Sequence, residues 1–219
     1  IDTLAADDVI NATEKGSDLI LSGTSNQPQG TSITVTLNGI DYVAIADASG
    51  QWQVTVPASA VSALGEARYT VSAAVTDSVG NPASTTHDVL VDSALPVVTL
   101  HTLAGDNIIN ASEVAAGQTL TGTVTNAAAG DVVTLTLGGK TYTAIVQNDL
   151  SWSLPLSAEI LNALGNGDLT VTASVTNVHG NTGSSSLEFT VEAQLPGLRI
   201  DTVAGDDVIN SIEHTQALV

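Results

Sequence analysis

An acidic phrase of ten residues occurs three times in the chain and limits the possible folds more than any other feature. The copies read AADDVINATE at 5–14, AGDNIINASE at 104–113 and AGDDVINSIE at 204–213. The central position of the phrase is held by Asp8, Asn107 and Asp207, which are 99 and then 100 residues apart. A period of that length is typical of one small domain. The sequence therefore predicts a repeat architecture.

Two complete units and the beginning of a third account for the whole sequence. We expect a first unit with a truncated start over 1–95, a second over 96–195, and the first strand and acidic loop of a third over 196–219. Units of about one hundred residues are large enough to fold around a core without disulfides, and the chain has no Cys. Because it also has no Met and begins at Ile1, we expect it to be a segment of a longer protein.

Each unit shows the pattern of seven short strands. Residues 31–37 and 131–137 alternate apolar residues with Thr, as in a half-buried strand, and an Asn-Gly or Gly-Gly pair suited to a tight turn follows each. Short helical turns are expected at 58–64 and 158–164. In the first unit the expected strands are 1–4, 19–25, 31–37, 42–45, 51–56, 69–76 and 87–91, and the second unit repeats them about one hundred residues later. This pattern predicts an all-β fold of tandem immunoglobulin-like antiparallel β-sandwiches.

The strand number also predicts how the units are stacked. Seven strands that run alternately up and down bring the chain into a sandwich at one pole, here named the leading pole, and out at the other, the trailing pole. Units should therefore be stacked end to end. The acidic phrase and the acid after the seventh strand should lie at the trailing pole, and the loop between the sixth and seventh strands at the leading pole. The junction of the first two units should gather Asp7, Asp8, Asn11, Glu14, Asp92, Asn177 and Asn181.

Such a cluster offers only carboxylate and amide oxygens, the ligands that Ca²⁺ takes in proteins, and adaptable loops favour Ca²⁺ over Mg²⁺. The alternative is that these residues are solvated turn formers, but recurrence of the whole phrase favours a metal. The phrase is neither an EF-hand loop nor a run of calcium-binding nonapeptides. The full predicted set of metal ligands is Asp7, Asp8, Asn11, Glu14, Asp77, Asn81, Asp92, Asp106, Asn107, Asn110, Glu113, Asn177, Asn181, Glu192, Asp206, Asp207, Asn210 and Glu213.

The charge of the chain excludes some classes of partner. Four Lys and Arg residues against 23 Asp and Glu residues give a formal net charge of −19 at pH 7, which repels nucleic acid and anionic lipid and favours bound cations. Disorder is the other interpretation of an acidic chain, but a hydrophobic content of 43% predicts a folded one. No apolar run is long enough to span a membrane, and no signal peptide opens this segment.

Several motifs are shared with a known family. They are IDTVAGDDVIN at 200–210, GKTYTA at 139–144, the two Trp strands, TDSVGN at 76–81 and VDSALP at 91–96. In these the sequence resembles the tandem bacterial Ig-like repeats of very large Gram-negative surface adhesins of the biofilm-associated (BapA) type. The resemblance implies type I secretion, display at the extracellular bacterial surface, calcium-stiffened stalks, and roles in cell adhesion, aggregation and biofilm. Its implied partners are neighbouring repeats, adhesins of other cells, and host or abiotic surfaces.

Three other functions compete with a structural stalk. An enzyme has little support, because the four His residues occupy unrelated repeat positions and no nucleophile, metalloprotease or phosphate-binding motif occurs. A carbohydrate-binding module could use Trp52, Trp152, Tyr42 and Tyr142 as stacking platforms. Both Trp residues, however, are in phase with inward aliphatic residues and are expected to be core residues. A homophilic self-association module stays open, because exposed strand edges and Thr-rich faces could pair with another copy.

Overall fold

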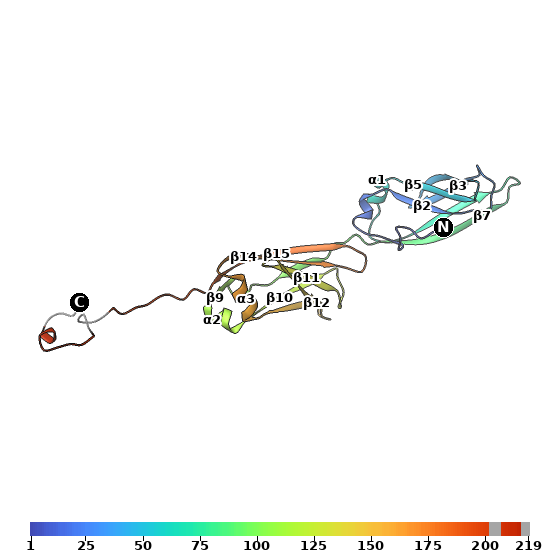
Figure 1. Cartoon of the computed structure of the whole chain (residues 1–219). Coiled ribbons are helices and arrows are strands. Elements are labelled where there is room, and N and C mark those ends of the chain that lie inside the picture. Colours follow the sequence, from blue (N-terminus) through green and yellow to red (C-terminus); the bar gives the residue numbers. More distant parts are fainter. Residues whose placement is uncertain (202–206, 216–219) are drawn as a thin grey trace.

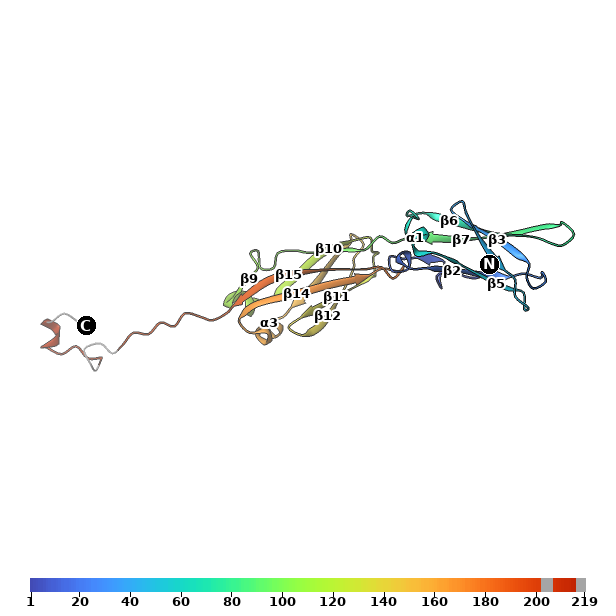
Figure 2. The ribbon, with the colours of Figure 1, turned by 90° about the horizontal axis from the view of Figure 1, so that it is seen from above.

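Two β-sandwiches follow one another in the computed structural model of the chain, which describes residues 1–201 and 207–215. Figures 1 and 2 show the sandwiches end to end, with the C-terminal segment leaving the second at its far pole. Buried side chains from Leu4 to Val91 form one hydrophobic core, and those from Val98 to Val191 form another. The predicted all-β, immunoglobulin-like sandwich fold is confirmed, while the unit boundaries near 95 and 195 stay predictions.

A five-stranded and a two-stranded sheet make up the first sandwich. The larger sheet has the order β1 (Val9–Ile10), β7 (Pro82–Val91), β6 (Arg68–Thr76), β3 (Ser32–Leu37) and β4 (Ile40–Ile45). The smaller sheet pairs β2 (Leu19–Thr24) with β5 (Gln51–Val56). The helical turns are η1 (Glu14–Gly16) and α1 (Ala58–Ser62). These turns contact each other at the trailing pole (Figure 1).

The second sandwich has the same plan with one more paired strand. Its larger sheet has the order β12 (Lys140–Ile145), β11 (Val132–Leu137), β14 (Gly167–Thr176), β15 (Thr182–Glu192) and β9 (Ile108–Asn110). The smaller sheet has the order β13 (Ser151–Leu156), β10 (Gln118–Thr125) and β8 (Val97–Leu100). The helices are α2 (Ala111–Ala116) and α3 (Ala158–Leu164). Among the described residues no helix is both long and apolar enough to cross a membrane.

The hairpins and the tryptophans follow from local sequence. Asn38 and Gly39, between β3 and β4, have φ values of 50° and 76°, the left-handed pair that a two-residue hairpin turn requires. Trp152 is 1% exposed, and its ring lies across Gly122, where a Cβ atom would come within 2.4 Å of the indole. Trp52 is buried in the same way beside Gly23. The prediction that both rings belong to the core is confirmed.

The acidic phrase is not the plain loop that the sequence predicts. Its Val-Ile pair forms β1, which runs parallel to β7 with Val9 opposite Leu90. The corresponding residues of the second unit form β9, which runs parallel to β15, and lead into α2. The seventh strands are also longer than predicted, since β7 begins at Pro82 and β15 at Thr182. The phrase therefore adds an edge strand to each larger sheet.

The predicted first strand of a third unit is not formed over residues 193–201, which carry no strand pairing and are almost entirely exposed. In the second unit the corresponding strand β8 pairs with β10. A 3₁₀ turn, η3 (Glu213–Thr215), follows the third acidic phrase.

Candidate inter-unit junction

One amide side chain of the second sandwich is bonded to two segments of the first. Asn181 Oδ1 accepts a hydrogen bond from the backbone N–H of Ala12 at 2.8 Å, and Asn181 Nδ2 donates to the backbone carbonyl oxygen of Asp92 at 2.8 Å. In the described part of the chain Asn181 is the one buried polar side chain, 2% exposed. Since a buried amide is costly unless bonded, these two hydrogen bonds fix the sandwiches against each other.

The loop that carries Asn181 is held in shape by Asn177. Asn177 Oδ1 accepts hydrogen bonds from the backbone N–H groups of His179 (3.1 Å) and Asn181 (3.0 Å), which makes an Asx turn. Gly180 has a φ of 79°, a conformation that favours glycine. The loop is therefore shaped by its own residues and presents Asn181 to the first sandwich.

The linker between the sandwiches is bonded near both of its ends. The backbone N–H of Ser93 donates to Glu66 Oε2 at 2.8 Å, and its hydroxyl donates to Glu66 Oε1. Lys15 Nζ lies 3.1 Å from Glu66 Oε1. The bonds from Ser93, and to a smaller extent Lys15, hold the pKa of Glu66 below its usual value. On the other side, Asn126 Nδ2 donates to the carbonyl oxygen of Leu95 at 3.1 Å.

A pocket of about 260 Å³ lies beside the linker and is lined by residues of both sandwiches, including Asp92, Asn126, Asp131, Asn177 and His179. His179 Nε2 lies 3.5 Å from Asp92 Oδ2. Asn177 Nδ2 donates to the backbone carbonyl oxygen of Asn126 at 3.3 Å. The lining of the pocket thus includes one carboxylate from each sandwich and two Asn side chains, and carboxylate and amide oxygens are ligands suited to a hard cation.

Four of the residues predicted for this junction lie there, namely Asn11, Asp92, Asn177 and Asn181. Asn11 Nδ2 packs against Gly180 of the second sandwich. Asn11 Oδ1 accepts from the N–H groups of Thr13 and Glu14, and Glu14 Oε2 accepts from the N–H of Asn11. The side-chain oxygens of Asn11 and Glu14 therefore cap the turn η1.

Asp7 and Asp8 lie away from the junction, on the side of the first sandwich. The backbone carbonyl oxygen of Asp8 accepts from the N–H of Leu90 at 2.9 Å. Asp8 is therefore level with Leu90, and Leu90 lies two residues, or about 7 Å along a strand, before the junction residue Asp92. Asp8 Oδ1 accepts from the N–H of Leu4 at 2.8 Å, and Asp7 Oδ1 accepts from the N–H of Val9. These carboxylates shape the crossover from the first strand to β1.

The crossover carries a contact between a histidine ring and a carboxylate in the first unit only. His87 Nε2 lies 2.7 Å from Asp8 Oδ1, whereas the second unit has Asn107 and Leu187 at these positions. The hydrogen bond from the backbone N–H of Leu4, with a smaller contribution from His87, holds the pKa of Asp8 below its usual value. Asn107 makes the same backbone bond without a charge.

The remaining predicted ligands lie away from this junction, and most of those described bond to their own loops. Asp77 accepts from the backbone N–H of Asn81 and from its Nδ2 amide, which holds the pKa of Asp77 below its usual value. Asp106 accepts from the N–H of Ile108, Asn110 and Glu113 cap α2, and Glu192 is exposed at the end of β15. Asp207 repeats the left-handed φ of Asp8, and Asn210 accepts from the N–H of Ile212. Asp206 and the side chain of Glu213 lie outside the described residues.

Within 1–201 and 207–215 no three His, Asp or Glu side chains are grouped closely enough to hold a metal ion. The pocket residues that the sequence analysis missed are Asn126, Asp131 and His179. The first-unit counterparts of Asp131 and His179 are Thr31 and Val79, so comparison of the repeats hides these two residues, whereas Asn126 corresponds to Asn26. The available signal was position, because all three lie in loops expected at the leading pole.

Comparisons with known proteins agree with the fold. The family model of the bacterial Ig-like domain matches residues 5–93. The chain is similar to a solved structure described as a Ca²⁺-stabilized adhesin that helps an Antarctic bacterium reach out and bind ice, with 30% identity, 96% of this chain and 53% of that chain covered, and a TM-score of 0.58. It thus spans about half the length of that structure. A structure from a 1.5-MDa bacterial ice-binding adhesin is 27% identical, with 96% and 70% covered and a TM-score of 0.55. No curated protein matches.

Proposed function

We propose that the chain is a spacer segment of a secreted bacterial surface adhesin, starting from the match of residues 5–93 to the family model of the bacterial Ig-like domain. The junction carries the proposal. Two sandwiches meet pole to pole, bonded through Asn181 and through both ends of the linker. A spacer needs fixed junctions, because free hinges would let its ends approach each other. Similarity to ice-binding adhesin structures over 96% of the chain supports the same function.

Calcium stiffening of the junction is part of this proposal. It is supported by the carboxylates of Asp92 and Asp131, one from each sandwich, beside one pocket, by the net charge of −19, and by the Ca²⁺-stabilized adhesin among the similar structures. Carbonyl oxygens of the loop 126–131 and the Asn177 amide would complete an oxygen donor set. Bound Ca²⁺ would neutralise acids of both sandwiches and link them. The predicted ligands at the other poles stay predictions.

The test uses a charge-matched pair of double variants. The variant Asp92→Asn with Asp131→Asn removes both pocket carboxylates, and the control Asp88→Asn with Asp168→Asn removes two exposed strand carboxylates that bond to threonines. Calorimetry in millimolar Ca²⁺ and in chelator should show wild type and control stabilised, by about 2.7 kcal/mol at one hundred times Kd. The pocket variant should lose that gain. If the melting temperature of the wild-type chain is the same in Ca²⁺ and in chelator, calcium has no part in the proposal.

Small-angle scattering tests the spacer itself. The interatomic distance distribution should match one elongated body in which the sandwiches stay in line. A distribution that needs two sandwiches in many relative orientations, with Ca²⁺ present, would contradict a spacer.

The competing functions have weaker support. Trp52 and Trp152 are 4% and 1% exposed, so neither ring is open to stack on a sugar. The similar structures are adhesins rather than enzymes. Export by type I secretion, display at the cell surface and a role in biofilm follow from the resemblance to BapA-type adhesins and belong to the same proposal.

A further inference from the structure

Two asparagines of the chain are followed directly by glycine, Asn38 in the first sandwich and Asn166 in the second. An Asn-Gly pair is chemically labile, because the backbone nitrogen of the second residue can attack the side-chain amide of the first, and glycine has no Cβ atom to hinder the approach. Both asparagines are exposed. Whether either pair reacts therefore depends on how firmly its two groups are held.

The two reacting groups of Asn38 and Gly39 are free. The pair forms the two-residue turn between β3 and β4, with Leu37 opposite Ile40. Across residues 1–201 and 207–215, neither the Asn38 side chain nor the backbone N–H of Gly39 takes part in a hydrogen bond. A Cβ atom added at Gly39 would meet nothing within 4 Å. The Asn38 amide can thus turn toward the Gly39 nitrogen without breaking a hydrogen bond.

The same groups of Asn166 and Gly167 are held. Asn166 Oδ1 accepts a hydrogen bond from the backbone N–H of Ala193 at 3.0 Å. Gly167 is the first residue of β14 and is paired with Val191 of β15. Both groups must be released before Asn166 can react, and the free energy of such a local opening lowers the rate.

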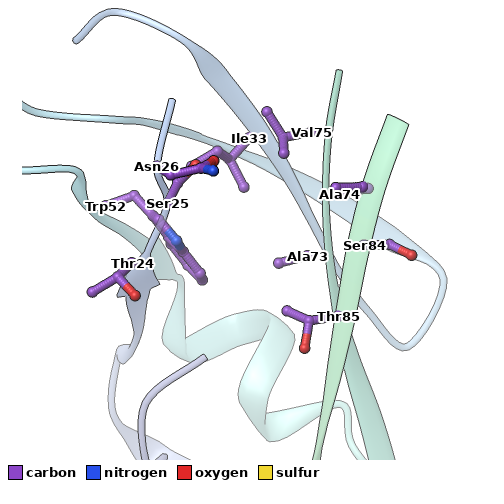
Figure 3. A pocket seen from close by; sticks show the side chains of 11 residues that line it. Thr24, Ser25, Asn26, Ile33, Trp52, Ala73, Ala74, Val75, Ser84 and Thr85 are labelled. Carbon is purple, nitrogen blue, oxygen red and sulfur yellow. The ribbon is translucent and has the colours of Figure 1, made fainter. Parts of the chain in front are cut away.

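A third exposed asparagine is blocked in another way. Asn26 lines a pocket of the first sandwich together with Trp52 (Figure 3). The next residue is Gln27, whose backbone N–H donates to Ser25 Oγ at 3.2 Å and whose Nε2 donates to Asn26 Oδ1 at 3.1 Å. The nitrogen that would attack is therefore occupied, and it belongs to a residue with a bulky side chain. We expect Asn26 to stay intact.

We propose that Asn38 is a site of spontaneous deamidation, a modification that goes beyond the spacer function. The Gly39 nitrogen loses its proton and bonds to Asn38 Cγ, the bond from Cγ to Nδ2 breaks, and ammonia leaves, which gives a cyclic succinimide. Water then opens the ring at either of its carbonyl carbons. One opening gives aspartate, and the other gives isoaspartate, in which the main chain runs through the former side chain. Nothing is oxidised or reduced.

The isoaspartate product changes one edge of the larger sheet. β4 is the last strand of this sheet and has β3 as its neighbour. The turn needs positive φ at both positions, 50° and 76°, and isoaspartate adds a main-chain carbon to a turn built for two ordinary residues. Leu37 and Ile40 then no longer meet in register, so β4 loosens. The second sandwich has Gly138-Gly139 at this place and escapes the reaction.

Mass spectrometry after incubation at mildly alkaline pH tests the site. Trypsin, which cleaves after Lys and Arg, leaves Asn38 in peptide 16–68 and Asn166 in peptide 141–199. In the folded chain the first peptide should convert at least about tenfold faster, since the contacts of Asn166 must open first, and fragmentation should locate the change at 38 rather than 26. In urea the two peptides should convert at similar rates. The proposal is overturned if they also convert equally in the folded chain, or if folded Asn38 stays intact while the denatured chain converts.

Two variants separate the site from its effect on the sheet. Asn38→Gly gives the Gly-Gly pair of the second sandwich and should abolish the rapid conversion of peptide 16–68. Asn38→Asp adds the charge without the extra main-chain carbon, so β4 should stay protected against hydrogen exchange. Aged wild-type chains that contain isoaspartate should exchange the amides of 40–45 faster than either variant. Rapid conversion that persists in Asn38→Gly would refute the site, and equal exchange in aged wild type and Asn38→Asp would refute the loosening of β4.

Discussion

Asn81 and Asn181 hold the same place in two loops of the same shape, but their side chains have different partners. Asn81 Nδ2 donates to Asp77 Oδ2 within its own loop and is exposed. Asn181 has Asn177 at that position, and its amide bonds to the other sandwich instead. The carboxylate of Asp77 accepts a hydrogen bond from the Asn81 side chain. The second loop has no carboxylate at its first position, Asn177, and the Asn181 side chain donates to the first sandwich instead.

At the residue scale, we expect Asn181→Ala to loosen the junction. The substitution leaves the N–H of Ala12 and the carbonyl oxygen of Asp92 without their partner, and an unpaired buried polar group costs about 1–3 kcal/mol. Calorimetry should show a lower melting temperature, and small-angle scattering a broader distribution of inter-unit distances. Asn81→Ala is the matched control, because its side chain touches only its own loop. If both variants scatter like wild type, Asn181 does not hold the units together.

At the scale of the element, the acidic phrase acts as a locally encoded crossover. Asp8, Asn107 and Asp207 share a left-handed φ of 63–64°, a conformation that Asp and Asn tolerate. In the first two copies the side chain accepts the N–H of the residue four positions earlier. The phrase therefore serves the crossing of the chain from one sheet to the other. This role accounts for Asp or Asn at the position of Asp8 and Asn107 without a metal.

That crossover should make the first unit sensitive to acid. The pKa of Asp8 lies below its usual value of 3.8 in the folded chain, so its contribution to stability is present above that value and is lost as pH falls through the lowered pKa. Asp8→Asn keeps the backbone bond, as Asn107 does, without titrating. The difference in unfolding free energy between wild type and Asp8→Asn should shrink from neutral pH to about pH 3. Denaturant unfolding at several pH values measures it, with Asp88→Asn as the control. A constant difference would show that Asp8 gains nothing from its charge.

The repeat and the strand alternation predicted most of the fold, because both depend on local sequence. The hairpin turn at 38–39 could be predicted from its Asn-Gly pair. The burial of Trp52 could be predicted from the alternation of inward and outward residues along its strand. β1 and β9 could not be predicted, since a strand of two or three residues is defined by its partner, β7 or β15, rather than by its own residues. The residues that meet at the junction were predicted in part: Asp92 and Asn181 are in contact as expected, while their role as metal ligands stays a prediction. Asp7 and Asp8 do not, because the phrase crosses from sheet to sheet before it reaches the pole.

At the scale of the whole molecule, the net charge of −19 makes two effects of Ca²⁺ hard to separate. Any salt screens the repulsion among exposed carboxylates, and at physiological ionic strength the screening length is about 8 Å. A bound ion acts in addition, and only on the chain that offers it ligands. The two effects differ in their dependence on the kind of cation rather than on ionic strength.

We therefore expect the melting temperature to rank the cations at equal ionic strength. NaCl should raise it modestly through screening, Mg²⁺ a little more, and Ca²⁺ most, because adaptable oxygen ligands suit Ca²⁺ better than the strict octahedron of Mg²⁺. In the variant Asp92→Asn with Asp131→Asn, Ca²⁺ should no longer raise the melting temperature more than Na⁺ does. The rise caused by NaCl should remain, since most of the 23 acids are still present. Calorimetry of both chains in the three salts is sufficient. Equal stabilisation of the wild-type chain by all three cations would mean that screening alone steadies the spacer.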